Sequence, residues 1–170
     1  MKTEELRAIQ TPIKERYKAQ PDAALITLKA RGRLGEGVTC SLQTGKALAI
    51  AGLHPATGGD GLSACSGDML LEALVACAGV TLNAVATAIG VAIRSGSVQA
   101  EGDLDFRGTL GVAKDAPVGF QRIRLHFDLD TDAPEDQLST LLRLTERYCV
   151  VFQTLRQSPE VTVSHDVVAA

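Results

Sequence analysis

Residues 69–93 read MLLEALVACAGVTLNAVATAIGVAI, and this stretch decides the fold. It carries one formal charge, Glu72, and its other side chains are apolar, small or uncharged. If the stretch is a helix, all of its faces are therefore nearly free of charge. A helix that shows no polar face to water has to be surrounded by protein, so we expect it to be the buried centre of the molecule. Cys77 lies near the middle of this helix and is the first candidate for chemistry.

The same stretch also has to be considered as a membrane span. Residues 73–93 are uncharged and long enough to cross a bilayer. They are mostly Ala, Gly, Thr and Val, however, with Asn83 in the centre, whereas spanning helices are typically richer in large apolar residues. Small residues let neighbouring backbones approach closely, so the sequence favours a helix in the core of a soluble protein over a membrane span.

Composition excludes other classes of function. The chain has 170 residues, of which 45 % are hydrophobic and 22 % charged, which fits one soluble domain with a core of its own. A net charge of −3, the lack of a long basic run and the absence of Trp argue against a nucleic-acid partner. The first 20 residues are rich in Lys, Arg and Glu and do not resemble a signal peptide, so we expect a cytoplasmic protein.

Periodicity and turn residues predict the remaining elements. Before the central helix we expect a helix over residues 3–19 in which Thr11-Pro12 starts a second short helix and kinks the chain, strands over 24–30, 38–43 and 46–51, a glycine-rich turn over 31–37 and a turn-rich segment over 54–67. After it, once Ser95 and Gly96 have stopped the central helix, we expect strands over 98–106 and 122–129, a helix capped by Asp132, a second helix over 149–157 and a closing strand over 161–167. Tight turns between strands indicate antiparallel sheets, so the class is α+β.

Four cysteines raise the functional question: Cys40, Cys65, Cys77 and Cys149. No Cys-x-x-Cys pair or His-rich spacing accompanies them, so a structural zinc site is not expected. Cys77 can be a packed core residue or a nucleophile. Cys149 is predicted near a helix N-terminus, where the helix dipole favours a thiolate, and packing is an equally good interpretation. Cys40 and Cys65 have no basic neighbour in the sequence and are expected to be structural.

Few charged residues are candidates for the same site. Arg31 and Arg33 are solvated turn charges unless the fold brings them to Cys77, where they would stabilise a thiolate. Asp68 suits the first turn of the central helix, where a carboxylate complements the dipole. The glycine loop over residues 57–61 lacks the Gly-Lys-Ser/Thr ending of a phosphate-binding loop, and the acidic run from Asp128 lacks the Gly and Glu of a calcium loop. We therefore expect no nucleotide and no metal.

Two stretches together resemble one family. DMLLEALVAC (residues 68–77) is similar to the helix motif of the OsmC/Ohr family, the osmotically inducible and organic hydroperoxide resistance proteins, and its form here is that of the OsmC-like branch. YCVVFQTL (residues 148–155) is similar to the second-cysteine motif of that family, and the glycines that follow Thr57 also match. The resemblance covers residues 24–168, so we expect a single domain over 1–170 with a helical extension over 1–22.

The resemblance implies an OsmC/Ohr-like fold in which antiparallel sheets wrap a long buried central helix in an intertwined homodimer. It implies a thiol peroxidase that reduces organic hydroperoxides in defence against oxidative stress. Cys77 matches the peroxidatic cysteine and Cys149 the resolving cysteine, while Arg33 matches the arginine that orients the thiolate. No bound cofactor is expected, and a small external dithiol restores the thiols.

One position departs from the family pattern. Peroxidase branches carry Glu ten residues before the cysteine, and this chain has Gly67 there, with Asp68 as the nearest acid. Nine residues of helix turn a side chain by about 180° and rise about 13.5 Å, so Asp68 would join the site only if a second copy supplies it. The alternative function is a non-catalytic OsmC-like dimer that binds small apolar molecules and keeps its thiols for packing.

Overall fold

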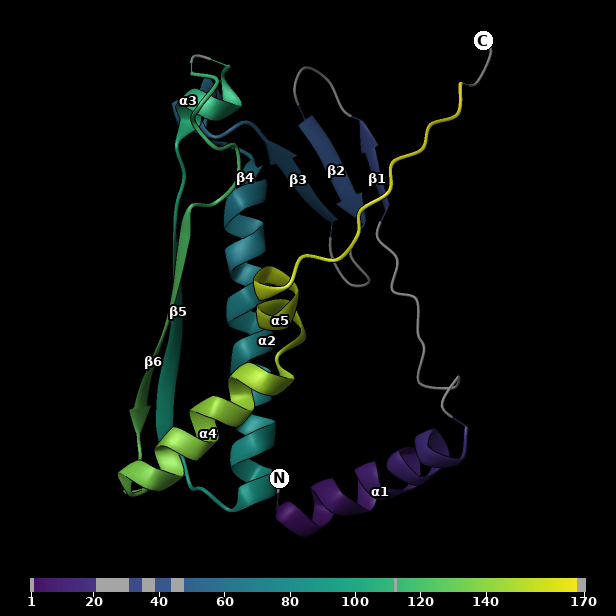
Figure 1. Cartoon of the computed structure of the whole chain (residues 1–170), viewed down its shortest axis with the longest axis vertical. Coiled ribbons are helices and arrows are strands. Elements are labelled where there is room, and N and C mark those ends of the chain that lie inside the picture. Colours follow the sequence, from purple (N-terminus) through teal and green to yellow (C-terminus); the bar gives the residue numbers. More distant parts are fainter. Residues whose placement is uncertain (1, 21–30, 35–38, 44–47, 112, 168–170) are drawn as a thin grey trace.

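The computed structural model describes residues 2–20, 31–34, 39–43, 48–111 and 113–167. Figure 1 shows a long helix at the centre, a two-stranded sheet along one side and a four-stranded sheet near its upper end. In chain order the elements are α1 (Thr3–Ala19), β1 (Arg31–Leu34), β2 (Thr39–Gln43), β3 (Leu48–Gly52), the 3-10 turn η2 (Pro55–Thr57), β4 (Ala64–Cys65), α2 (Ser66–Ile89), β5 (Ser95–Asp103), α3 (Phe106–Thr109), β6 (Arg122–Asp130), α4 (Glu135–Tyr148) and α5 (Val150–Arg156).

The central helix α2 forms as predicted, with shifted ends. It begins at Ser66 and ends at Ile89, where Gly90 adopts a left-handed backbone with φ of +76° and its N–H donates to Ala86 O. A glycine in this conformation terminates a helix because it has no Cβ to clash. The prediction that Ser95 and Gly96 stop the helix was wrong, since Gly90 has already done so and both residues belong to β5.

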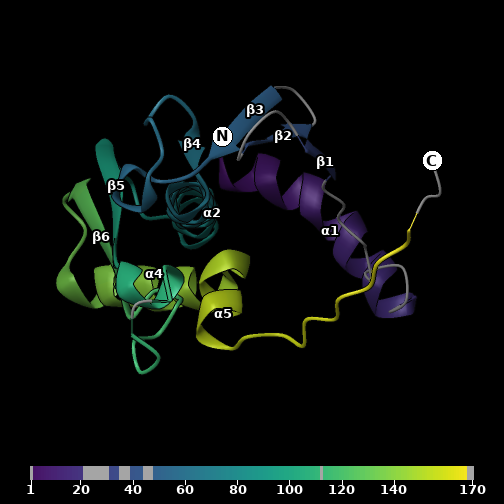
Figure 2. The same cartoon turned by 90° about the horizontal axis from the view of Figure 1, so that it is seen from above.

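Most of the cover that the described chain gives α2 lies on one face, and α1 adds a contact near the end of the helix, where the Thr3 hydroxyl donates to Thr87 O at 2.9 Å. Its buried residues recur at helical spacing, and α4, α5 and β5 pack against the helix. Figure 2, which looks along α2, shows β5 and β6 beside it and α4 and α5 on an adjoining side. Val80, on another face, is 72 % exposed. The sequence predicted that every face of α2 is buried, whereas one chain buries mainly one face. The buried residues of that face are Leu74, Ala78, Leu82, Val85 and Ala86.

Strands β5 and β6 form the flat wall against which α2 packs. They pair antiparallel from Ser95 opposite Asp130 to Asp103 opposite Arg122. Alternate residues of both strands are half-buried, which is the period of two expected for a sheet with one covered face. Gly79 of α2 leaves room for Val98, whose methyl lies 3.6 Å from the point where a Cβ would stand. The sequence predicted β6 almost to the residue.

The second sheet has the order β1-β2-β3-β4. The predicted hairpin is confirmed, because β2 and β3 pair antiparallel. The glycine-rich turn expected over residues 31–37 was wrong in its first half, since Arg31–Leu34 forms β1 on β2. Strand β4 pairs parallel with β3, whereas the tight turns in the sequence predicted antiparallel pairing. The strand expected over residues 24–30 lies outside the described residues.

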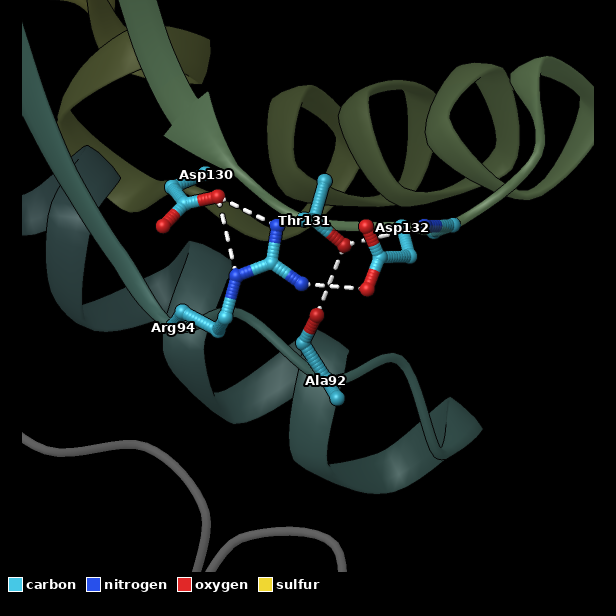
Figure 3. A network of polar contacts seen from close by, with 6 residues as sticks. Ala92, Arg94, Asp130, Thr131 and Asp132 are labelled. Carbon is cyan, nitrogen blue, oxygen red and sulfur yellow. Dashed lines mark hydrogen bonds and ion pairs between the residues drawn. The ribbon is translucent and has the colours of Figure 1, made fainter.

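A polar network fastens the segment that follows α2 to the segment that follows β6 (Figure 3). Arg94 donates from Nε to Asp130 at 2.9 Å and pairs with Asp132 through a second nitrogen. The Thr131 hydroxyl donates to Ala92 O at 2.7 Å. Asp132 was predicted to cap the following helix, and this was wrong: α4 begins after Pro134, while the Asp132 carboxylate binds Arg94.

Three further predictions are corrected. Helix α1 runs unbroken through Pro12, so no second helix starts there. The strand expected over residues 98–106 ends at Asp103 as β5, because Asp105 caps α3 by accepting from the Arg107 N–H. The closing strand expected over residues 161–167 is absent, since residues 158–167 form neither helix nor strand.

Candidate functional site

Cys77 lies on the covered side of α2. It is half-buried and packs against a small cluster whose fully buried members are Leu74, Ala78 and Cys149. Leu74 and Ala78 flank it within one turn of the helix, and α5 supplies the facing side of the cluster. The position is sheltered but not closed, so a small molecule can reach this sulfur more readily than the buried one beside it.

Cys149 lies at the junction of α4 and α5. Its N–H donates to Thr145 O at 2.9 Å as the end of α4, and its own carbonyl accepts from Gln153 N–H at 3.0 Å in the first turn of α5. Its extended backbone, with φ of −73° and ψ of +109°, turns the chain between the two helices. The side chain is 1 % exposed. The predicted place near a helix N-terminus is confirmed.

The two thiols pack in one cluster, and their surroundings favour charge on Cys77. Burial alone raises the pKa of Cys77, but hydrogen bonds to its sulfur outweigh this and bring the pKa below its ordinary value. The donors are the N–H of Val151, the Cys149 thiol, the N–H of Val150 and the Thr81 hydroxyl. Hydrogen bonds to a thiolate stabilise the charged form, so Cys77 is the more acidic thiol.

Cys149 behaves in the opposite way. Burial raises its pKa first, and the neighbouring Cys77 raises it further, because a second negative charge beside a thiolate is unfavourable. The N–H groups of Phe152 and Val151, at the start of α5, do favour a thiolate at Cys149 as expected, but burial and the neighbouring Cys77 outweigh them. The N–H groups at the start of α5 also lower the pKa of Cys77. Because Cys77 is less buried than Cys149, they bring its pKa below the ordinary value.

Arg33 and Asp68 are the other two predicted site residues. The backbone of Arg33 lies in β1, opposite Ser41 of β2, and its side chain is outside the described part of the structure. Asp68 is the third residue of α2 and is exposed. Because the helix is continuous from Ser66 to Cys77, Asp68 is not brought to Cys77 of its own chain. Its carboxylate borders cavities of about 380 and 370 Å³ near the start of the helix.

The groups that sequence reasoning missed are Thr81 and the N–H groups of Val150 and Val151. Thr81 follows Cys77 by four residues, and side chains with this spacing share a helix face. That spacing was a usable signal. The peptide N–H groups left no signal in the sequence, because any residue other than proline supplies one.

Cys65 lies away from this pair. It is half-buried in β4, directly before α2, and lines the cavity of about 370 Å³ together with His54. Cys40 lies in β2, and its side chain is outside the described residues. Within the described ranges, no group of three or more His, Cys, Asp or Glu side chains is placed to hold a metal ion.

Helix α2 is long and apolar enough to cross a membrane by length and composition. The core helix of a soluble protein passes the same test, and α2 is in contact with β5, α4 and α5 as such a helix would be. Its length and composition are therefore weak grounds for a membrane span.

Comparison with known proteins agrees with this geometry. The sequence model of the OsmC-like protein family matches residues 58–164, which include both Cys77 and Cys149. No curated protein sequence matches the chain.

Three solved structures resemble the fold. An OsmC-like protein from Mycoplasma pneumoniae has a TM-score of 0.66 and 17 % identity, over 78 % of this chain and 89 % of that one. An organic hydroperoxide resistance protein OsmC from Legionella pneumophila has a TM-score of 0.62 and 18 % identity, over 79 % and 92 %. An organic hydroperoxide resistance protein from Elizabethkingia anophelis has a TM-score of 0.63 and 15 % identity, over 79 % and 91 %. With the match over most of the sequence, this likeness places the chain in the OsmC-like family, to which it belongs.

Proposed function

We propose that the protein is a thiol peroxidase that reduces organic hydroperoxides, with Cys77 as the attacking thiolate and Cys149 as the resolving thiol. One observation carries the proposal: the two thiols pack in one cluster, with a lowered pKa on the partly exposed Cys77 and a raised pKa on the buried Cys149. An attacking sulfur needs charge and access, and a resolving sulfur needs proximity.

The first step oxidises Cys77. Its thiolate attacks the distal oxygen of the hydroperoxide, the O–O bond breaks, and the alkoxide leaves and takes a proton to become an alcohol. Cys77 becomes a sulfenic acid. The N–H groups of Val150 and Val151, at the start of α5, lower the pKa of Cys77 and so favour the attacking thiolate.

The second step joins the two sulfurs. The Cys149 sulfur attacks the sulfenic sulfur of Cys77, the S–O bond breaks, and hydroxide leaves with the Cys149 proton as water. The product is a Cys77–Cys149 disulfide. A small external dithiol then reduces it by two exchange steps and becomes oxidised itself. In balance, one hydroperoxide and one dithiol give one alcohol, one disulfide and one water, with no bound cofactor or metal.

The working unit in this proposal is a cytoplasmic homodimer. Its support is the uncovered face of α2 and the exposed valines of the tail, Val161, Val163 and Val167. Asp68 acts in the site only if a second copy supplies it, and Arg33 is the arginine proposed to orient the thiolate. Asp68→Asn tests this: a lowered peroxidase rate with normal folding is expected, and an unchanged rate removes Asp68 from the site.

The experiment that tests the function treats the reduced full-length chain with cumene hydroperoxide and maps disulfides by peptide mass spectrometry. We expect fast Cys77–Cys149 linkage, much slower linkage with hydrogen peroxide, none in Cys77→Ser, and a trapped sulfenic acid at Cys77 in Cys149→Ser. Cys65→Ser is the matched control and should link at the normal rate. Thiols that stay reduced would contradict the proposal and favour the alternative, a dimer that binds small apolar molecules.

A further inference from the structure

A cavity of about 340 Å³ lies between α5, the start of β6 and α2. Six apolar side chains line it: Leu74, Phe120, Ile123, Leu125, Phe152 and Leu155. Its volume falls at the lower end of the range of small-molecule sites, and its lining is of the kind that such sites use. It adjoins the thiol pair, because all of these side chains except Phe120 also belong to the cluster that contains Cys77 and Cys149.

One wall of the cavity is fixed by a glycine. A Cβ at Gly102 would stand 2.4 Å from a ring carbon of Phe120, closer than real contacts allow. The Phe120 ring therefore rests directly on the backbone of β5. This contact holds an aromatic side chain of the loop before β6 in place as a wall and keeps the space beside Leu74 open.

The charge at the cavity has one sign. Arg156, at the end of α5, borders it and places its guanidinium 5.8 Å from the centre of the Phe152 ring. Arg156 makes no ion pair with any residue in the described part of the chain. The lining residues include no Asp or Glu. A guanidinium beside an apolar wall suits a carboxylate with an apolar chain.

Arg122, at the start of β6, also borders the cavity. The alternation of β6 puts Arg122 on the solvent face together with Arg124. Arg124 binds both carboxylate oxygens of Asp103, which lies opposite Arg122 in the sheet. Arg156 differs from Arg122 in that its guanidinium lies over the ring of Phe152, so it is the cation placed beside the apolar lining.

We propose that this cavity binds a single-chain aliphatic carboxylate, with the chain against Leu74, Phe152 and Leu155 and the carboxylate on Arg156. The site is independent of peroxide reduction, because binding needs neither thiol to react. The cavity lies against the cluster that holds the thiol pair, and Arg156 makes it selective for negative charge.

The test is titration calorimetry of the reduced full-length chain with decanoate, butyrate and decanol. Decanoate is expected to bind more tightly than butyrate, which cannot fill the apolar wall, and more tightly than decanol, which lacks the charge. Arg156→Gln should weaken decanoate binding about fivefold or more, the factor that about 1 kcal/mol of ion pairing gives. Arg156→Lys should keep most of the affinity, since it keeps the charge.

Arg143→Gln is the matched control. Arg143 is an exposed arginine of α4 outside the cavity, so its loss changes net charge equally and should leave decanoate binding unchanged. The proposal is overturned if decanoate does not bind, if decanol binds as tightly, or if the Arg143 and Arg156 variants weaken binding alike. None of these results bears on disulfide formation, which is measured separately with cumene hydroperoxide.

Discussion

The thiols of Cys77 and Cys149 pack in one cluster, yet their pKa values move in opposite directions. Burial acts on both. Cys77 differs in that it collects four hydrogen bonds, two of them from the peptide groups of Val150 and Val151. The motifs around the cysteines were enough to select these two residues from the four in the sequence. Which of the two would hold the charge could not be predicted, because that depends on where the N–H groups of α5 point.

The Thr81 hydroxyl gives a prediction at this scale. Thr81→Val removes a hydrogen bond that lowers the pKa of Cys77, so that pKa rises and less thiolate is present at any pH below it. The pH profile of Cys77 alkylation by iodoacetamide should move to higher pH, and the rate at neutral pH should fall about two- to fivefold. Peptide mass spectrometry resolves Cys77 from the other cysteines. Thr81→Ser should restore the normal profile.

Thr87→Val serves as the control for this change. Thr87 lies two turns further along α2, and its hydroxyl donates to Asn83 O instead of a thiol. Its loss should leave the alkylation profile of Cys77 where it was. If both variants shift the profile equally, the effect comes from the helix and not from the hydroxyl of Thr81.

At the scale of elements, strong periodicity was a reliable guide and turn chemistry was not. The alternation of residues 122–129 and the amphipathic pattern that follows predicted β6 and α4. The glycines after Arg31 suggested a turn, but pairing with β2 holds Arg31–Leu34 in a strand, so contacts between distant segments overrode the local signal. Asp132 had the right chemistry for a cap, and Arg94 binds it instead.

The contact between α2 and α4 gives a prediction of stability. Leu141 is 0 % exposed and packs with Leu82, Val85 and Ala86 of α2. Leu141→Ala leaves a cavity in this cluster and should lower the free energy of unfolding by about 2–5 kcal/mol. Urea unfolding followed by circular dichroism measures the change. Leu110→Ala, at a position 54 % exposed, should change the free energy by less than about 0.5 kcal/mol. Equal losses would mean that α4 does not hold α2 in place.

At the scale of the whole molecule, the central helix was predicted from composition, but the extent of its cover was not. An apolar helix requires partners on every face, and the sequence does not say which chain provides them. Within one chain the buried stripe of α2 faces α4, α5 and β5. A second stripe, formed by Ala73, Ala76, Val80 and Asn83, faces away and is exposed. We infer from this exposed stripe that a second copy covers α2.

This stripe carries the last prediction. If a second copy covers α2, wild-type protein sediments as a dimer, and Val80→Asp shifts it toward monomer because the dimer would bury an unpaired carboxylate. Val118→Asp is the matched control: Val118 is 63 % exposed in the loop before β6, so the same change there should leave the dimer intact. Sedimentation velocity over a range of concentrations separates the outcomes. A wild-type monomer, or a Val80→Asp dimer as stable as wild type, would mean that a second copy does not pack on this stripe of α2. The same samples also test the site, because a dimer that positions Asp68 or Arg33 for Cys77 should lose peroxidase rate in step with its dissociation.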